Sequence, residues 1–184
     1  MIHRFLDPIA SRSPDPGSRT PDRVGITTYL HALHAAGEPL ARASSGLRHL
    51  AEMMPGCSHA AVMITSEVAD HAAVATSDTA RRCDELQRLL DGGPGLHAFR
   101  TGHSVVSHDL GTEPRWPSWR QRAVEELHVR AALAVPLSSQ DRPVGALSLY
   151  SGSPQELMGI DLALLHALAA PLAAVLAETA AGPR

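Results

Sequence analysis

The sequence predicts an α+β fold, in which an antiparallel sheet has the N- and C-terminal helices on one face and connecting helices on the other. The segment from Val129 to Ser151 holds two apolar runs joined by a polar loop, which indicates a β-hairpin. Neither run alternates cleanly between polar and apolar residues, so we expect both faces of this hairpin to be covered. Apolar residues at helical spacing begin and end the chain. A length of 184 residues with 44% hydrophobic residues suits one domain.

The order of elements follows from changes in apolar period and from turn residues. The predicted elements are helices at 26–36 and 39–53, strands at 57–65 and 71–77, a helix from 78 to about 90, a short helix at 94–100, a strand at 103–109, a helix at 116–127, the hairpin at 129–151 and a long final helix. Residues 1–25 are polar and rich in proline, so we expect a flexible tail there and a single domain at 26–184.

Three details concern helix ends. Ser77 or Asp78 is the expected N-cap of the third long helix. The final helix has two possible starts, a capping box from Ser153 to Glu156 or a later start near Asp161. Pro171 lies inside that helix and is expected to kink it.

Composition excludes several classes of function. All 16 basic residues are Arg and the chain has no Lys, so it has neither a Schiff-base lysine nor a phosphate-binding lysine loop. A net charge of -3 and a pI near 6.4 argue against a nucleic-acid interface. The apolar stretch from Leu162 to Ala177 is interrupted by His166 and Pro171, and we expect it to fall short of a membrane span. These observations predict a cytoplasmic protein that binds neither nucleic acid nor membrane.

Reactive residues do not form a recognisable constellation. The 11 histidines lack the spacing of metal ligands, and no serine lies in a nucleophile elbow. Cys57 and Cys83 fall on separate predicted elements without a clear activating partner. We therefore expect no catalytic residue, no metal and no cofactor. The alternative is a thiol-based redox enzyme or switch that uses both cysteines.

Several short motifs in one order resemble those of GAF domains, and most closely the GAF modules of actinobacterial GAF-ANTAR regulators. The resemblance covers about residues 40–177. The motifs are Leu86-Gln87, Gly93-Pro94, Ala98, Arg100-Thr101-Gly102, Asp109-Leu110, Arg115-Trp116-Pro117, Val135-Pro136-Leu137 and Gly145 to Ser151. The resemblance implies a sheet of five or six strands with a small-molecule pocket between the sheet and the connecting helices.

The departures from the family pattern matter for function. Related modules often have Cys after the Gly-Pro pair, where this chain has Gly95. A chain without Asn or Lys lacks the Asn-Lys-Phe motif of cyclic-nucleotide-binding members. GAF-like methionine sulfoxide reductases carry cysteines in pocket loops, whereas Cys57 and Cys83 are expected elsewhere. We also expect no ANTAR output module after the last helix, so that output would pass through dimerisation or another chain.

The predicted ligand pocket lies under the segment from Arg115 to Leu127. Two tryptophans in a chain with 3% aromatic residues are expected to face inwards, because each buries a large apolar area. With residues of the preceding helices they would form a mainly apolar enclosure, the usual form of a ligand site. The predicted lining residues are Leu86, Leu89, Leu96, Phe99, Trp116 and Trp119.

A homodimer is also expected. The final helix has apolar residues on more than one side, more than one sheet face can bury, and the first helix offers a matching stripe. The resemblance implies that first and last helices pack against a second chain. The predicted interface residues are Leu30, Leu33, Leu165, Leu168, Leu172 and Val175. The sequence thus favours a non-enzymatic sensory or regulatory domain that binds a small molecule or a partner regulatory protein, with a degenerate dimerisation module as a further alternative.

Overall fold

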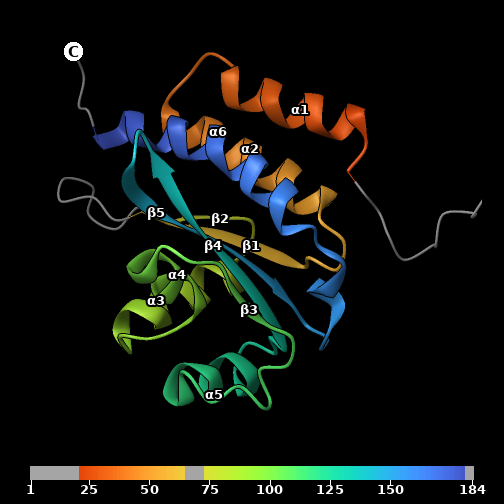
Figure 1. The fold of residues 1–184 in the computed structure, drawn as a ribbon, viewed down its shortest axis with the longest axis vertical. Coiled ribbons are helices and arrows are strands. Elements are labelled where there is room, and N and C mark those ends of the chain that lie inside the picture. The colour runs from red at the N-terminus through yellow and green to blue at the C-terminus, as the bar shows by residue number, and fades with distance from the viewer. Residues whose placement is uncertain (1–20, 65–72, 181–184) are drawn as a thin grey trace, which may run out of the picture.

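The computed structural model describes residues 21–64 and 73–180, which form three layers. One sheet lies between helices α1, α2 and α6 on one face and α3, α4 and α5 on the other (Figure 1). The elements in chain order are α1 (Arg23–His34), α2 (Pro39–Met53), β1 (His59–Ile64), β2 (Ala73–Ala75), α3 (Asp78–Leu89), α4 (Pro94–Thr101), β3 (Val105–Ser107), α5 (Pro117–Glu125), β4 (Ala131–Ser139), β5 (Arg142–Ser151), the short 3-10 helix η1 (Glu156–Gly159) and α6 (Leu162–Ala180). This arrangement confirms the predicted fold class.

The sheet has the order β2-β1-β5-β4-β3, and every neighbouring pair is antiparallel. The β4–β5 hairpin therefore lies in the middle of the sheet, as its apolar strands predict. The polar loop predicted within it is mostly strand, because Ser139 pairs with Arg142 and only Gln140 and Asp141 form the turn. Both turn residues have positive φ, 51° and 61°, which matches the twist of a tight hairpin.

The two faces of the sheet carry side chains of different size. Successive side chains of a strand point to opposite faces. The face toward α1, α2 and α6 carries large aliphatic side chains, whereas the face toward α3, α4 and α5 carries mainly alanines. The first set is Val62, Ile64, Leu133, Val135, Leu137, Leu147 and Leu149, and the second includes Ala61, Ala132, Ala134 and Ala146. The sheet thus separates two cores of unlike character.

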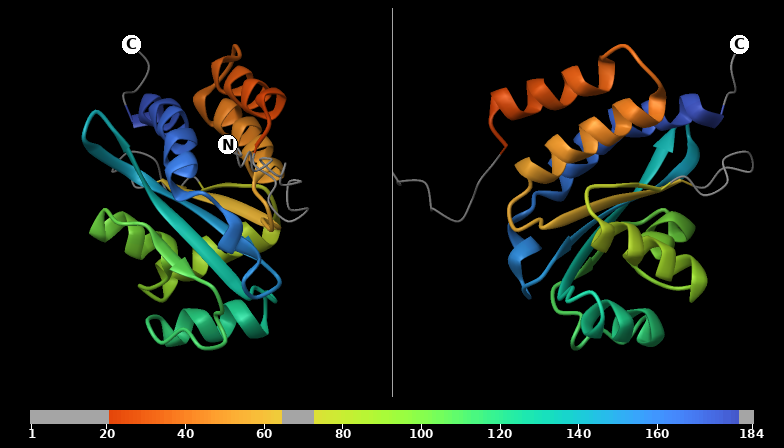
Figure 2. Two further views of the ribbon diagram at one scale, coloured as in Figure 1. Left: turned by 45° about the vertical axis from the view of Figure 1, so that its right-hand side comes forward. Right: turned by 180° about the vertical axis from the view of Figure 1, so that it is seen from behind.

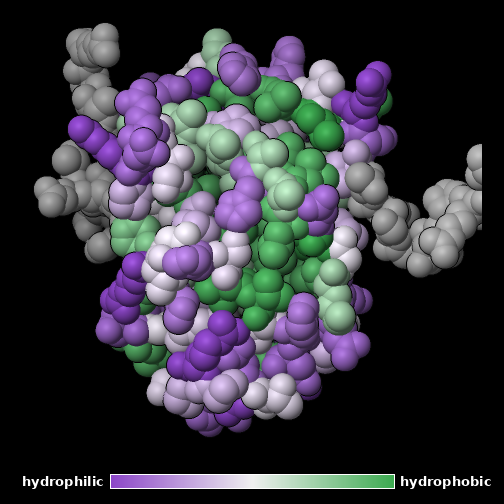
Figure 3. Space-filling view, in the orientation of Figure 1, coloured by the Kyte–Doolittle hydropathy of each residue, from purple (hydrophilic) through white to green (hydrophobic). Residues whose placement is uncertain are grey.

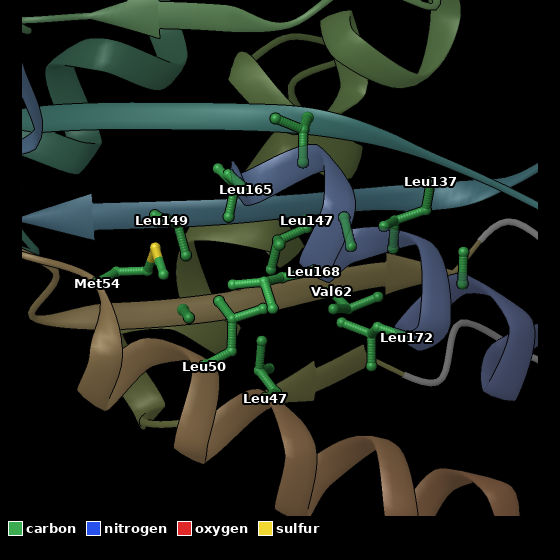
Figure 4. Packing of buried hydrophobic residues seen from close by; sticks show 14 of the residues in the cluster. Leu47, Leu50, Met54, Val62, Leu137, Leu147, Leu149, Leu165, Leu168 and Leu172 are labelled. Carbon is green, nitrogen blue, oxygen red and sulfur yellow. The ribbon is translucent and has the colours of Figure 1, made fainter. Parts of the chain in front are cut away.

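Helices α2 and α6 pack on the aliphatic face (Figure 4). Leu47 and Leu50 of α2 and Leu168 and Leu172 of α6 meet over the middle of the sheet, where all four are buried. Helix α1 lies outside α2 (Figure 2), and the hydroxyl of its Tyr29 donates a hydrogen bond to the carbonyl of Leu168. This core fixes the terminal helices to the sheet.

Helix ends mostly follow the sequence signals. Ser77 caps α3 by accepting a hydrogen bond from the amide of Ala80 at 3.2 Å. The capping box at Ser153 does not start α6, because Asp161 accepts the amide of Ala163 at 2.8 Å and the helix begins at Leu162. Helix α1 begins at Arg23, before the expected boundary at residue 26. The tail up to residue 20 and the β1–β2 connection at 65–72 lie outside the described residues.

Helix α6 is one helix that runs through Pro171, and a kink there stays a prediction. Its segment from Leu162 to Thr179 has the length and apolar composition of a membrane span, contrary to the expectation that His166 and Pro171 leave it too short. In this fold 39% of that segment is buried, by the sheet and by its neighbouring helices. The remaining surface of α6 is therefore unusually apolar for an exposed helix.

Gly145 of β5 permits a close approach of two central strands. It pairs with Ile64 of β1 and Leu137 of β4, and a Cβ atom there would lie 2.0 Å from the carbonyl oxygen of Met63. That distance is far inside van der Waals contact, and the backbone of β1 cannot move without breaking its ladder.

We therefore expect Gly145→Ala to lower the free energy of unfolding by about 3 kcal/mol or more. Urea denaturation measures the loss. Gly159→Ala is the matched control, because a Cβ atom at Gly159 has nothing within 4 Å, and its effect should stay within about 0.5 kcal/mol. Equal stabilities of the two variants would contradict the account of the β1–β5 approach.

Candidate functional site

The candidate site lies on the alanine-lined face of the sheet, under α3, α4 and α5 (Figure 2). Small side chains on β1, β4 and β5 let α4 lie close to the strands. Tyr150 is the one large side chain that β5 contributes to this face, and Ser148 lies two residues before it on the same side. The helices therefore meet the sheet at a mixed polar and aromatic spot.

Most of the predicted pocket residues come together here. Leu86, Trp116 and Trp119 are buried in this second core, and Phe99 is partly buried against it. Leu96 is buried in α4, where its amide contacts Gln87. The inclusion of Leu89 is wrong, because its side chain is 69% exposed.

A hydrogen-bonded triangle joins α3 to β5. The hydroxyl of Tyr150 donates to Oδ1 of Asp84 at 2.9 Å, and Nε2 of Gln87 donates to the same Oδ1 at 3.0 Å and to the Tyr150 hydroxyl at 2.9 Å. The amide of Leu96 at the start of α4 donates to Oε1 of Gln87 at 3.0 Å. Asp84, Gln87, Ser148 and Tyr150 are all fully buried. One polar cluster thus connects two helices and the central strand.

Two oxygen atoms in this cluster make no well-formed hydrogen bond within the described part of the chain. They are Oδ2 of Asp84 and Oγ of Ser148, although Ser148 lies near enough to the Tyr150 hydroxyl to lower the pKa of Tyr150. Burial raises the pKa of the Asp84 carboxyl from 3.8 to about 7, against the lowering effects of Tyr150, Arg88 and Gln87. Burial and the neighbouring Asp84 also raise the pKa of Tyr150, so its hydroxyl stays a donor. An unpaired buried carboxyl is costly, and such groups are typical of functional sites.

Aromatic rings cover the cluster on the α5 side. The rings of Trp119 and Tyr150 lie 6.4 Å apart at 36°, and Trp116 meets Trp119 edge-on at 6.2 Å. The indole Nε1 of Trp119 donates to the carbonyl of Cys83 at 3.1 Å, which attaches α5 to α3. His97 of α4 meets Trp116 edge-on at 5.6 Å.

The segment that leads into α5 is held by an ion pair. Nε and Nη2 of Arg115 donate to the two carboxylate oxygens of Glu113 at 2.7 and 2.6 Å, and Nη2 also donates to the carbonyl of Val106 at 2.9 Å. Arg115 lowers the pKa of Glu113 to about 2. The guanidinium lies 4.5 Å from the ring centre of Trp116, at a cation–π distance. Arg115 is therefore engaged with its own segment and does not form an anion clamp.

Glycines at the start of α4 make the close contact with Gln87 and Ser148 possible. Gly93 has φ of +144°, and a Cβ atom there would lie 2.3 Å from Cγ of Gln87. A Cβ atom at Gly95 would lie 2.6 Å from Oγ of Ser148. The Gly-Gly-Pro-Gly sequence therefore brings the α4 backbone onto the polar cluster, besides ending α3.

Comparison with known proteins agrees with this geometry. A family model described as a GAF domain matches residues 41–177. The chain belongs to the GAF family. GAF domains are in general sensory or regulatory ligand-binding modules. No curated protein matches the sequence.

Solved structures share the GAF fold at low sequence identity. The GAF domain of an Acinetobacter phosphoenolpyruvate-protein phosphotransferase has a TM-score of 0.62 and 13% identity, over 86% of this chain and 94% of that one. The GAF region of a putative membrane protein from Geobacter sulfurreducens has a TM-score of 0.59 and 17% identity, over 76% and 93%. A free methionine-R-sulfoxide reductase from Thermoplasma acidophilum has a TM-score of 0.52 and 17% identity, over 76% and 93%. These similarities show the fold alone.

None of the four residues of the polar cluster, Asp84, Gln87, Ser148 and Tyr150, was predicted from the sequence as a site residue. The signal for Asp84 is its spacing, because Ala80, Cys83, Asp84 and Gln87 follow the i, i+3, i+4, i+7 pattern of one buried helix face. Alternation along β5 places Ser148 and Tyr150 on one face, but it does not say which helix meets them.

The two cysteines of this GAF domain lie on opposite sides of the sheet. Cys83 is buried in the core under α5, whereas Cys57 packs against the aliphatic core. Burial raises the pKa of Cys57 to about 12 and also raises that of Cys83. Both thiols are therefore poor nucleophiles and cannot pair with each other. Among residues 21–64 and 73–180, no three His, Cys, Asp or Glu side chains are grouped to hold a metal ion.

Most of the predicted dimer residues lie in the protomer's own core. Helix α6 turns Leu165, Leu168, Leu172 and Val175 toward the sheet and α2, and all four are buried. Leu33 is also fully buried, whereas Leu30 is 36% exposed. One sheet face and α2 therefore cover these residues within a single protomer, and the interface stays a prediction.

The buried Asp84 carboxyl makes stability depend on pH. Because its pKa is about 7 in the folded state and 3.8 ordinarily, the folded state holds a proton that the unfolded state releases. Stability from this group is complete below about pH 4 and is lost as pH rises through 7. Asp84→Asn keeps an oxygen for the two donors and removes the charge.

We expect the free energy of unfolding of Asp84→Asn, relative to the unmodified protein, to rise by about 1 to 3 kcal/mol between pH 5 and pH 8. Denaturant unfolding at each pH measures it. Asp78→Asn, on the same helix with a side chain that is 94% exposed, should show no comparable rise. Parallel pH profiles of Asp84→Asn and the unmodified protein would contradict the buried-carboxyl account.

Proposed function

We propose that this GAF domain is a non-enzymatic sensory or regulatory module that binds a small molecule between the sheet and helices α3, α4 and α5. The observation that carries the proposal is the buried polar cluster of Asp84, Gln87, Ser148 and Tyr150, with two unpartnered oxygens beneath an aromatic cover. A few polar groups inside an apolar enclosure are typical of ligand sites. A purely structural core has no need of an unpaired carboxyl oxygen, since an apolar side chain would avoid its desolvation cost.

A thiol-based enzyme is the less favoured reading of the site. The reductase from Thermoplasma acidophilum shares the fold, but at 17% identity this likeness says nothing about activity. Cys57 and Cys83 lie in separate cores, and burial raises the pKa of both thiols. Neither residue has the thiolate character that redox chemistry needs.

We further propose a cytoplasmic role in transcription regulation. The resemblance to GAF modules of actinobacterial GAF-ANTAR regulators supports a role in transcription regulation, in the cytoplasm and through a partner regulatory protein. No nucleic-acid or membrane binding is proposed for this domain itself. The ligand would then act by changing how the module meets its partner.

Native mass spectrometry of freshly purified protein tests the proposed function. We expect a non-covalent adduct that is lost on denaturation. Trp116→Ala should reduce its retention, because Trp116 covers the edge of the enclosure and is 7% exposed. Leu89→Ala is the control, since Leu89 is exposed on the adjacent helix. If the native spectrum shows only the mass of the protein, and no compound of a metabolite panel raises its melting temperature, a degenerate dimerisation module would be favoured.

A homodimer remains a proposal, with a changed interface. The outward side of α6 carries the exposed residues Ala163, Ala167, Ala170 and Ala174, one or two turns apart. A band of apolar residues is visible on the face of the molecule where α6 lies (Figure 3). Small side chains let two helices approach closely. A second copy could therefore bury this face.

We expect Ala167→Glu to convert a dimer to a monomer in light scattering at micromolar concentration, because it would bury a carboxylate between the helices. Gln121→Glu is the matched control, with the same charge change at an exposed position on α5. A monomeric unmodified protein would overturn the dimer proposal.

A further inference from the structure

The hydrogen bonds of the polar cluster leave a shortage of donors. Both hydrogens of the Gln87 amide and the hydrogen of Tyr150 are used within the Asp84–Gln87–Tyr150 triangle. The Leu96 amide is used on Gln87. Oδ1 of Asp84 accepts two hydrogen bonds, whereas Oδ2 accepts none, and Oγ of Ser148 makes no well-formed hydrogen bond. The pKa of Asp84 is about 7, so its carboxyl is ionised above that pH. A group that completes the cluster there must donate to Asp84.

The carboxyl also lacks a cationic partner. Among the ion pairs of residues 21–64 and 73–180, none includes Asp84. Arg88 lies one helical turn further along α3, and its charge acts on Asp84 without a contact. A buried carboxylate is stabilised most by a donor that carries positive charge. The missing group is therefore best matched by a cationic N–H donor.

The surroundings favour a flat ligand. The ring of Tyr150, whose hydroxyl belongs to the cluster, lies beside that of Trp119 at a tilt of 36°, and Trp116 meets Trp119 edge-on. Ring faces attract both planar aromatic groups and cations. Alanines on the sheet leave the aromatic rings as the principal walls.

A ligand would reach this site by displacement of α5. That helix lies at the periphery of the fold, away from the terminal helices (Figure 1). Its Trp119 is held by one indole hydrogen bond to Cys83, and the preceding segment by the Arg115–Glu113 pair. Movement of α5 therefore leaves the aliphatic core intact, whereas it withdraws Trp119 and Ala123 from the second core.

We propose that Asp84 and Ser148 bind the N–H groups of a planar aromatic cation, of the aryl amidinium class, against Trp119. This proposal rests on the proposed function and specifies the chemical class of its ligand. The ion pair forms between an N–H of the ligand and Oδ2 of Asp84, and the hydroxyl oxygen of Ser148 accepts a hydrogen bond from a second N–H. The Asp84–Gln87–Tyr150 triangle positions the carboxylate.

Benzamidine is the probe, and the indole N–H signals of the protein's two tryptophans report its binding by NMR. We expect saturable shifts of both signals, with a dissociation constant on the order of 1 mM or tighter for a fragment of this size. Asp84→Asn should weaken binding about tenfold or more, and Ser148→Ala severalfold. Asp78→Asn should bind as the unmodified protein does, because Asp78 is exposed on the same helix.

Benzamide and benzoate are the matched neutral and anionic probes. The proposal would be overturned if benzamide bound as tightly as benzamidine, or if benzoate bound. It would also be overturned if benzamidine gave no saturable shift up to about 10 mM, or if a folded Asp84→Asn variant bound benzamidine with unchanged affinity. If Asp84→Asn does not fold, Ser148→Ala decides, and unchanged affinity overturns the proposal. A retained small molecule in native mass spectra without benzamidine binding would reject the cation class and leave the proposed function standing.

Discussion

Alternation along the three central strands divides this GAF domain into two unlike halves. Because neighbouring residues of a strand face opposite ways, β5 gives Leu147 and Leu149 to one core and Ser148 and Tyr150 to the other. The leucines meet α2 and α6 in a dense aliphatic layer. The serine and tyrosine meet α3 and α4 across a floor of alanines. One short segment thus builds the supporting core and the candidate site together.

The alanine floor allows the helices of the second layer to come near the sheet. Gly93 and Gly95 allow the same close approach from the helix side, because a Cβ atom at Gly93 would collide with Gln87 and one at Gly95 with Ser148. This close approach is what removes Asp84 from water. The hydrogen bonds from Tyr150 and Gln87 offset part of the cost of burying the carboxylate. Because burial raises the pKa of Asp84 to about 7, protonation of the carboxyl at lower pH removes the charge and reduces the cost further.

The polar cluster also joins elements that are far apart in sequence. Asp84 and Gln87 come from α3, Leu96 from α4 and Tyr150 from β5, and Trp119 of α5 is hydrogen-bonded to α3 through the Cys83 carbonyl. A change at Asp84 therefore alters hydrogen bonds that connect α3, α4 and the central strand β5. The central strand in turn contacts the terminal helices through Leu147 and Leu149, which are buried in the aliphatic core.

The order and type of the elements can be predicted from the sequence, because apolar period, caps and turn residues are local signals. The predicted helix at 39–53 matches α2 (Pro39–Met53), and three predicted pocket residues, Leu86, Trp116 and Trp119, lie in one core. Packing between elements selects which side of each helix is covered: Leu89 faces water, whereas Leu165 and Leu168 are buried against the sheet. Packing also brings Asp84 into hydrogen-bond contact with Tyr150, which lies 66 residues away in the sequence. The periodicity of apolar residues defines which face of a helix or strand is buried, but only packing between elements distant in sequence determines which element covers that face.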